Sequence, residues 1–327
     1  MPDTPTKLAD VIVPEIFNPY YREMSTRVNA FFQSGIVVPV PDLDIGAKGG
    51  SKVQMPFWKA LGERAQLLDD TDDLEIKKVE TGQDEAVLHA RALVYGGTDL
   101  AAALAGSDPM MTIGDGMAEN WSSEFNYQLI ATLQGATGAF LAETPDVNAW
   151  DISALSGSAA YIDGPSFIDA GQMLGDAKAK IAGILMHSAV ESWLRKSDLI
   201  EDIPDSEGKA TLPFFQGKRV IIDDANAAAS GGIYDTFLFG PGAIGFGEGN
   251  PKTPTETGRE ALLGGGQDYL VTRRHYVLHP RGIKWDPASG VPAKLTPSDA
   301  ELEGAGNWTR VWQPKNIAIV LFRHKIG

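Results

Sequence analysis

The most regular hydrophobic pattern of the chain lies between residues 108 and 135. Apolar side chains recur there every three or four positions, at Met110, Ile113, Met117, Trp121, Phe125, Leu129 and Leu133. This spacing places them along one stripe of an α-helix, for which Asp108 is a suitable N-cap and Pro109 a suitable first residue. Three glycines lie inside the segment, and each costs about 1 kcal/mol relative to Ala. We therefore expect a long helix that is held by the packing of its stripe.

A period of two replaces the helical period between residues 51 and 98. The segment SKVQMPFWKAL leads out, EAVLHARALVY leads back, and the acidic stretch LLDDTDDLEIKKVETG lies between them. One face of the returning strand carries Val87, His89, Arg91, Leu93 and Tyr95. These features predict a long β-hairpin. Because two strands alone are marginally stable in water, we expect the hairpin to dock on another chain.

The first 50 residues carry short apolar pieces broken by prolines, which predicts an irregular arm that needs a surface to lie on. Further along, Ser166 with Asp169 and Ser188 with Glu191 are capping signals, and they predict two helices between 165 and about 197. Expected strands are GKRVIIDD (217–224), GIYDTFLFG (232–240), DYLVTRRHYVLHPRG (268–282) and NIAIVLFRHK (316–325). The fold class is therefore α+β.

Composition limits the chemistry of the 327-residue chain. It contains no cysteine, which removes disulfides and thiolate sites, and its net charge of −15 disfavours general binding to phosphate backbones. No apolar run is long enough to cross a bilayer, and the N-terminus does not have the pattern of a secretory signal, so we expect no membrane partner.

Gly240, Gly242 and Gly245 lie on the G-x-G-x-x-G spacing of a dinucleotide-binding loop. That site requires a helix directly after the glycines, whereas here FGEGNPKTPTETG follows. Pro241 also removes an amide donor. We therefore expect a tight, exposed turn, and a nucleotide-dependent enzyme using residues 239–250 remains the less favoured alternative.

Other candidate sites are weaker still. The stretch from Asp69 to Glu80 resembles a calcium loop, but Leu74 occupies the place of the required glycine. His275 and His279 would stand about 13 Å apart on a strand, too far to share one ion. Asp223 and Asp224 are expected to make turn contacts. The sequence thus predicts no catalytic, cofactor or metal site.

Several segments, taken in order, carry a family resemblance. They are LADVIVPEIFNPY, KVQMPFW, TDLAAALAGSDPM, FFQGKRVIIDD, FLFGPGAIGFGEG and TRRHYVLHPRGIKW. From about residue 8 to the C-terminus, the chain resembles the major capsid proteins of tailed bacteriophages, which have the Hong Kong 97-like fold. The resemblance implies an N-terminal arm (1–50), an extended hairpin loop (51–98), a peripheral domain with a spine helix (99–149), an axial domain (150–265) and return strands of the peripheral domain (266–327).

The function implied is a non-enzymatic subunit that self-assembles into hexamers and pentamers of an icosahedral shell. The shell would be assembled in the host cytoplasm and would enclose double-stranded DNA without sequence-specific binding. Scaffolding, portal and cementing proteins are the further partners implied, and a bacterial nanocompartment shell is the alternative within the same fold. Candidate inter-subunit contacts are Phe17, Phe31, Phe32, Trp58, Arg64, Asp69, Asp70, Asp72, Asp73, Lys77 and Lys78.

Overall fold

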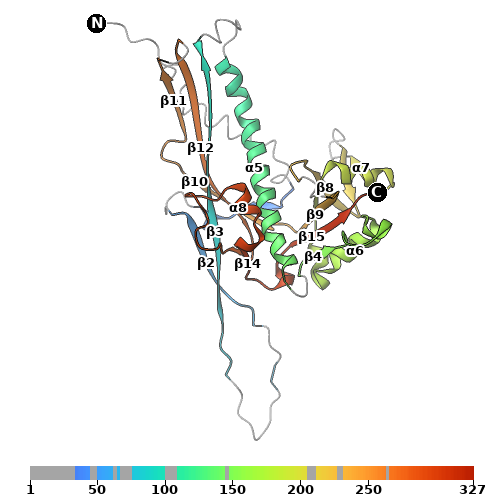
Figure 1. Cartoon of the computed structure of the whole chain (residues 1–327). Coiled ribbons are helices and arrows are strands. Elements are labelled where there is room, and N and C mark those ends of the chain that lie inside the picture. Colours follow the sequence, from blue (N-terminus) through green and yellow to red (C-terminus); the bar gives the residue numbers. More distant parts are fainter. Residues whose placement is uncertain are drawn as a thin grey trace, which may run out of the picture.

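A computed structural model describes residues 34–44, 50–61, 65–66, 76–99, 109–143, 147–204, 211–226, 231–262 and 265–327. The fold is mixed α+β, as expected. Helix α5 stands in the middle, with a long sheet on one side and a compact unit of strands and short helices on the other (Figure 1). Most of the predicted N-terminal arm and the acidic tip of the hairpin lie outside the described residues.

Helix α5 (Pro109–Leu141) begins where the sequence predicts and ends six residues later than expected. From Met117 to Leu133 its predicted stripe is buried. The indole Nε1 of Trp121 also donates a hydrogen bond of 3.0 Å to Thr272 Oγ1. Gly135 is required by packing, because an added methyl group there would collide with the carbonyl oxygen of Leu302.

The long sheet has six strands. Its order is β1 (Val37–Pro39), β10 (Ile244–Gly249), β12 (Gln267–Pro280), β3 (Thr81–Thr98) and β2 (Lys52–Trp58), with β11 (Thr255–Glu260) also on β12. The predicted hairpin corresponds to β2 and β3, which pair from Lys52 with Val87 to Trp58 with Thr81. From Leu88 onward β3 pairs with β12 instead. The isolated two-stranded ribbon is therefore much shorter than the sequence suggested, because β12 is long enough to continue the ladder.

The second sheet has seven strands. Its order is β4 (Ala149–Asp151), β15 (Ile319–Lys325), β9 (Ile233–Phe239), β5 (Gly183–Met186), β8 (Lys218–Ile222), β7 (Thr211–Phe215) and β6 (Ile200–Pro204). Helices α6 (Gly164–Gln172) and α7 (Ser188–Lys196) cover one face. The strand expected at 316–325 is present as β15, and it belongs to this sheet rather than to the long one, since it pairs with β9.

The remaining elements are short. They are η1 (Pro41–Leu43), η2 (Gly157–Ala160), η3 (Gly175–Lys180), β13 (Ile283–Trp285), α8 (Asp299–Glu303), η4 (Ala305–Asn307), β14 (Trp308–Arg310) and η5 (Pro314–Asn316). Among them, α8, η4 and β14 pack against α5. The strands β13 and β14 pair with each other.

The prediction of two helices between 165 and 197 is only partly correct. The first helix begins two residues earlier than the predicted cap, because Asp163 accepts from Ser166 N at 2.8 Å and Ser166 Oγ accepts from Asp163 N at 3.0 Å. The short apolar run at β5 is a buried strand, a case that periodicity alone does not separate from a helix. At the second helix, the cap is the imidazole of His187, which accepts from Ala189 N at 2.9 Å.

The glycine-rich segment is also different from the expected exposed turn. Only residues 240–243 form the turn, and the rest is strand β10, which lies between β1 and β12. Glycine is needed there for close approach, since a side chain at Gly247 would collide with Leu43 and one at Gly249 with His275. This segment therefore belongs to the long sheet.

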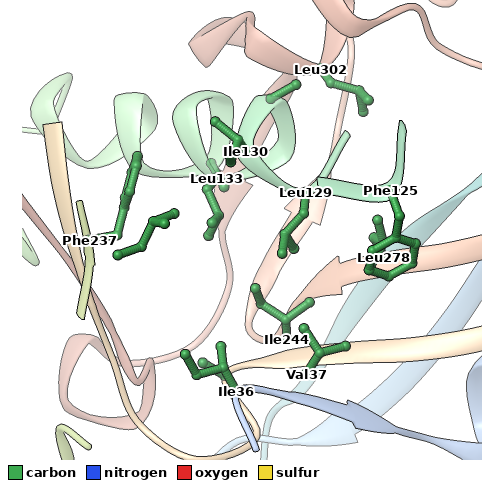
Figure 2. Close-up of a cluster of buried hydrophobic side chains, with 14 of the residues drawn as sticks. Ile36, Val37, Phe125, Leu129, Ile130, Leu133, Phe237, Ile244, Leu278 and Leu302 are labelled. Carbon is green, nitrogen blue, oxygen red and sulfur yellow. The ribbon is translucent and has the colours of Figure 1, made fainter. Parts of the chain in front are cut away.

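The seven-stranded sheet separates two hydrophobic cores, and α5 belongs to the larger one. In Figure 2, Leu129 of the helix points towards Ile244 and Phe125 lies beside Leu278, both of the long sheet, and Phe237 of the seven-stranded sheet belongs to the same core. The second core lies on the other face of the seven-stranded sheet, against α6 and α7. Helix α5 thus joins the two sheets through a continuous apolar layer.

Candidate assembly surfaces

The base of the hairpin projects from the body of the subunit (Figure 1). Trp58, the last residue of β2, is 72% exposed, and the next large apolar side chains among the described residues, Leu61 and Ile76, are 83% and 98% exposed. Lys59 Nζ lies 2.8 Å from Glu80 Oε2 across the two strands. Hydrogen bonding to this ammonium group lowers the pKa of Glu80 below its usual value. The hairpin therefore presents apolar side chains and a surface ion pair to its surroundings.

The predicted contact residues have different outcomes. Trp58, Lys77 and Lys78 are described by the structure, and all three are exposed. The remaining predicted contacts, which lie outside the described residues, are Phe17, Phe31, Phe32, Arg64, Asp69, Asp70, Asp72 and Asp73. For Trp58 and the two lysines, exposure is what a contact with another chain requires.

The opposite face of the hairpin base packs within the subunit. Val53 and Met55 lie against the small core that contains Leu43. The Phe57 ring meets the Trp312 ring edge-on, with 6.1 Å between their centroids. The sequence did not predict the contact with Trp312, because Phe57 lies 255 positions earlier in the chain (312 − 57) and no local motif connects the two residues.

A buried carboxylate fixes the same face to the body. Asp84 Oδ2 accepts a hydrogen bond of 3.1 Å from Gly282 N, and His279 Nε2 lies 2.9 Å from the same oxygen. The carbonyl of Gly282 in turn accepts from the backbone N–H groups of Val311 and Trp312. The direction of the hairpin is therefore set by packing and hydrogen bonds inside one subunit.

A second polar cluster joins the long sheet to the helices. His89 Nδ1 lies 2.8 Å from Gln128 Oε1, which also accepts from the Tyr276 hydroxyl at 2.9 Å. Since this oxygen can only accept, Nδ1 carries the proton of a neutral imidazole. Burial, assisted by the charge of Arg91, lowers the pKa of His89 to about 3. Arg91 itself donates to Asp299 at 2.9 Å, so the cluster extends from β3 to α8.

The weaker chemical candidates make structural contacts. Asp223 Oδ1 accepts from Ala225 N at 2.9 Å, and Asp224 Oδ1 accepts from Ser188 N at 3.2 Å. Burial raises the pKa of Asp223, whereas hydrogen bonding to Ser188 lowers that of Asp224. Within the described part of the chain, no group of three or more His, Cys, Asp or Glu side chains could hold a metal ion. In the same part, no helix is long and apolar enough to cross a membrane.

Comparison with solved structures shows which fold the chain has. The capsid of Ralstonia phage GP4 superposes with a TM-score of 0.57 at 9% identity, covering 91% of this chain and 92% of that one. The capsid of cyanophage Pam1 gives a TM-score of 0.51 at 8% identity, covering 89% and 91%. At such identities the likeness shows the fold alone, and that fold is the one found in phage capsid subunits.

The sequence comparison identifies the family. The major capsid protein of Bacillus phage SPP1 is 43% identical over 329 residues, which cover 98% of each chain. No protein-family model matches the chain. The chain belongs to the family of major capsid proteins of tailed bacteriophages. It is a structural, non-enzymatic component of the virion that assembles with copies of itself into the head shell.

Proposed function

We propose that the chain builds an icosahedral head of hexamers and pentamers with a Hong Kong 97-like subunit. The hairpin base carries the proposal, because it projects from the subunit and exposes the apolar side chains of Trp58, Leu61 and Ile76. Exposed apolar area of this kind is typical of a surface that binds another protein. When such an element reaches onto a neighbour, the contact is heterologous, and it closes into rings or shells when the rotation closes. Each contact can be modest, since the lattice sums many of them.

The subdomain roles are part of the same proposal. Residues 1–50 act as the arm, 51–98 as the extended loop and 99–149 as the peripheral domain with its spine helix α5. The seven-stranded sheet serves as the axial domain, so β15 of the C-terminal segment joins it and β10 joins the peripheral sheet. Scaffolding, portal and cementing proteins are the proposed further partners.

The shell would enclose double-stranded DNA without sequence-specific contacts. The net charge of −15 supports this, because a container of that charge is not drawn to phosphate backbones. Arg273 donates to Glu256 at 2.9 Å, and Arg281 lies over the ring of Trp312. These two cations are thus engaged within the subunit.

A shortened hairpin tests the assembly role. Lys59 N donates to the carbonyl of Glu80 at 2.9 Å, so a two-residue Asn-Gly turn can replace residues 60–79 and close the strand ladder. We expect the variant to melt like the wild-type subunit but to form no closed shells under conditions in which the wild type forms them. Thermal denaturation of the unassembled subunit measures the first outcome, and light scattering coupled to size exclusion, with electron micrographs of the early peak, measures the second. Normal shells from the shortened chain would refute the role.

A further inference from the structure

The second half of β3 is an open edge of the long sheet. On one side, β3 pairs with β12 as far as Thr98. On the other side, the pairing with β2 ends at Val87, and no strand of the described chain takes its place between Ala92 and Gly96. This stretch of the sheet therefore has a neighbouring strand on one side alone.

The backbone groups that face the open side belong to even-numbered residues. The N–H of Leu88 donates towards β2, to the carbonyl of Ser51, and the carbonyl of Ala90 accepts from Thr296 Oγ1 at 3.3 Å. The N–H and C=O of one residue point to the same side of a strand, and this side alternates along the chain. The next residues that direct both groups outward are Ala92, Val94 and Gly96.

The open stretch of β3 lacks the residues that protect other edges. Natural edge strands discourage pairing with charges or prolines. The edge strands of the two large sheets follow this rule, with Pro39 in β1, Lys52 and Pro56 in β2, Glu256 and Arg259 in β11, Asp202 and Pro204 in β6, and Asp151 in β4. Between Ala92 and Thr98 there is neither a charge nor a proline. Nothing in the sequence of this edge opposes a further strand.

A shell needs a second kind of contact besides a heterologous one. Heterologous contacts close subunits into rings, and the rings must then be joined to one another. An isologous contact around a two-fold axis is the simplest way to join them, because both copies present the same patch. A strand edge meets this requirement, since half a turn about an axis perpendicular to the sheet makes the strand antiparallel to itself.

Given the proposed shell of hexamers and pentamers, we infer that the open edges of β3 from two copies of this chain pair antiparallel around a two-fold axis at Val94. Two rings are thereby joined through one continuous sheet. Ala92 lies opposite Gly96 of the second copy, and the outward N–H and C=O groups bond across the axis. A second copy is the occupant because the family assembles with copies of itself. The edge is also uncharged in a chain of net charge −15, so the two copies meet where like charges do not oppose each other.

The subunit has room for the end of the second strand. A cavity of about 590 Å³ lies beside β3, where Ala90, Ala92 and residues 293–296 are among the residues that line it. In the inferred register, Thr98 of the second copy comes opposite Ala90, whose carbonyl is already bonded to Thr296. The second strand therefore has to end at this point, and β3 does end at Thr98.

A disulfide tests the contact directly, because the chain contains no cysteine. Val94→Cys in the full-length chain places one thiol on each side of the axis, where opposed Cα atoms lie about 5.5 Å apart, within disulfide range. Val94 is 59% exposed, so the melting temperature should not change. Mild oxidation of assembled shells should convert most subunits to disulfide-linked dimers on a non-reducing gel, with no larger species.

Val271→Cys is the matched control. Val271 lies directly opposite Val94 on β12 and shares its face of the sheet. Its two copies would be three strand spacings apart, roughly 14 Å, which is too far for a disulfide. This variant should therefore run as a monomer.

A charge at the axis tests the energy of the same contact. Val94→Lys places two like charges opposite each other and should raise the subunit concentration at which shells appear by about tenfold or more. Val271→Lys, one strand away, should assemble at the wild-type concentration.

The remaining outcomes separate this contact from the proposed function. Shells in which Val94→Cys stays monomeric refute the edge pairing, and they leave the shell of hexamers and pentamers standing. Dimers from both cysteine variants refute the register, because an edge contact at Val94 cannot join the two Val271 positions. Electron micrographs of the wild type without hexamers and pentamers refute the proposed function itself.

Discussion

The seven-stranded sheet and the hairpin base are both built from β-strands, but they bury very different fractions of their residues. In the sheet, Phe237–Phe239 of β9 and Ile319–Phe322 of β15 are all at most 1% exposed. In the hairpin base, every second residue of β2 is exposed. The sheet is covered on both faces by α5 and by the short helices, whereas the hairpin is covered on one. We therefore expect substitutions in the buried strands of the seven-stranded sheet to cost more stability than substitutions at the exposed positions of the hairpin base.

Polar groups follow the same division. Arg323 donates two hydrogen bonds, of 2.7 and 2.8 Å, to the carboxylate of Asp235 directly across the strand pair. His324 Nε2 lies 2.8 Å from Thr236 Oγ1 in the same pair. Beyond the buried Asp84 at its base, the hairpin has the exposed pair of Lys59 and Glu80, and exposed pairs of this kind contribute little to stability.

The largest expected effect is in the seven-stranded sheet. Phe322→Ala removes a fully buried ring from the core against α6 and α7. We expect the free energy of unfolding to fall by about 3 to 5 kcal/mol, measured by chemical denaturation of the unassembled subunit. Leu61→Ala in the hairpin also truncates a large apolar side chain, but an exposed one, and it should leave the free energy of unfolding unaltered. Equal losses at the two positions would contradict the division between the regions.

The next largest expected effect is a loss of subunit stability in acid. Burial is the largest cause that lowers the pKa of His89 to about 3 and that of His324 to about 4, whereas an unfolded histidine titrates near 6.5. Below that value the unfolded chain gains protons that the folded chain does not, so stability present above pH 6.5 is lost as the pH falls. The expected slope between pH 6.5 and 5 is at most about 1.4 kcal/mol per pH unit for each histidine.

Denaturation at several pH values checks this slope. His89→Gln removes one titrating group, and it should flatten the dependence whatever it does to stability at pH 7. An unchanged slope in this variant would show that His89 is not held neutral in the folded subunit.

The sequence predicted the elements whose pattern is local. The stripe of α5, the alternation of β3 and the strands β8, β9, β12 and β15 are confirmed, because periodicity within a segment reports which face is buried. Long-range pairings were missed. The contact of Phe57 with Trp312 and the hydrogen bond of Gly282 to Asp84 join segments about 200 or more residues apart, so no spacing rule connects them. The glycines of β10 were interpreted as a turn because their need for close approach depends on Leu43, a residue on another element.

The smallest effect concerns the helix that lies between the two sheets. Gly135 and Gly116 both interrupt α5, and propensity alone treats them alike. A methyl group at Gly135 would collide with the backbone of Leu302 and the indole of Trp308, whereas at Gly116 it would meet no atom within 4 Å. Gly135→Ala should therefore lower the free energy of unfolding by about 1 to 3 kcal/mol through overpacking, and Gly116→Ala should raise it by about 0.5 to 1 kcal/mol. Thermal denaturation measures both changes. If the two free-energy changes have opposite signs, packing against α8 and β14 determines which position requires glycine. If they have the same sign, helix propensity explains both positions.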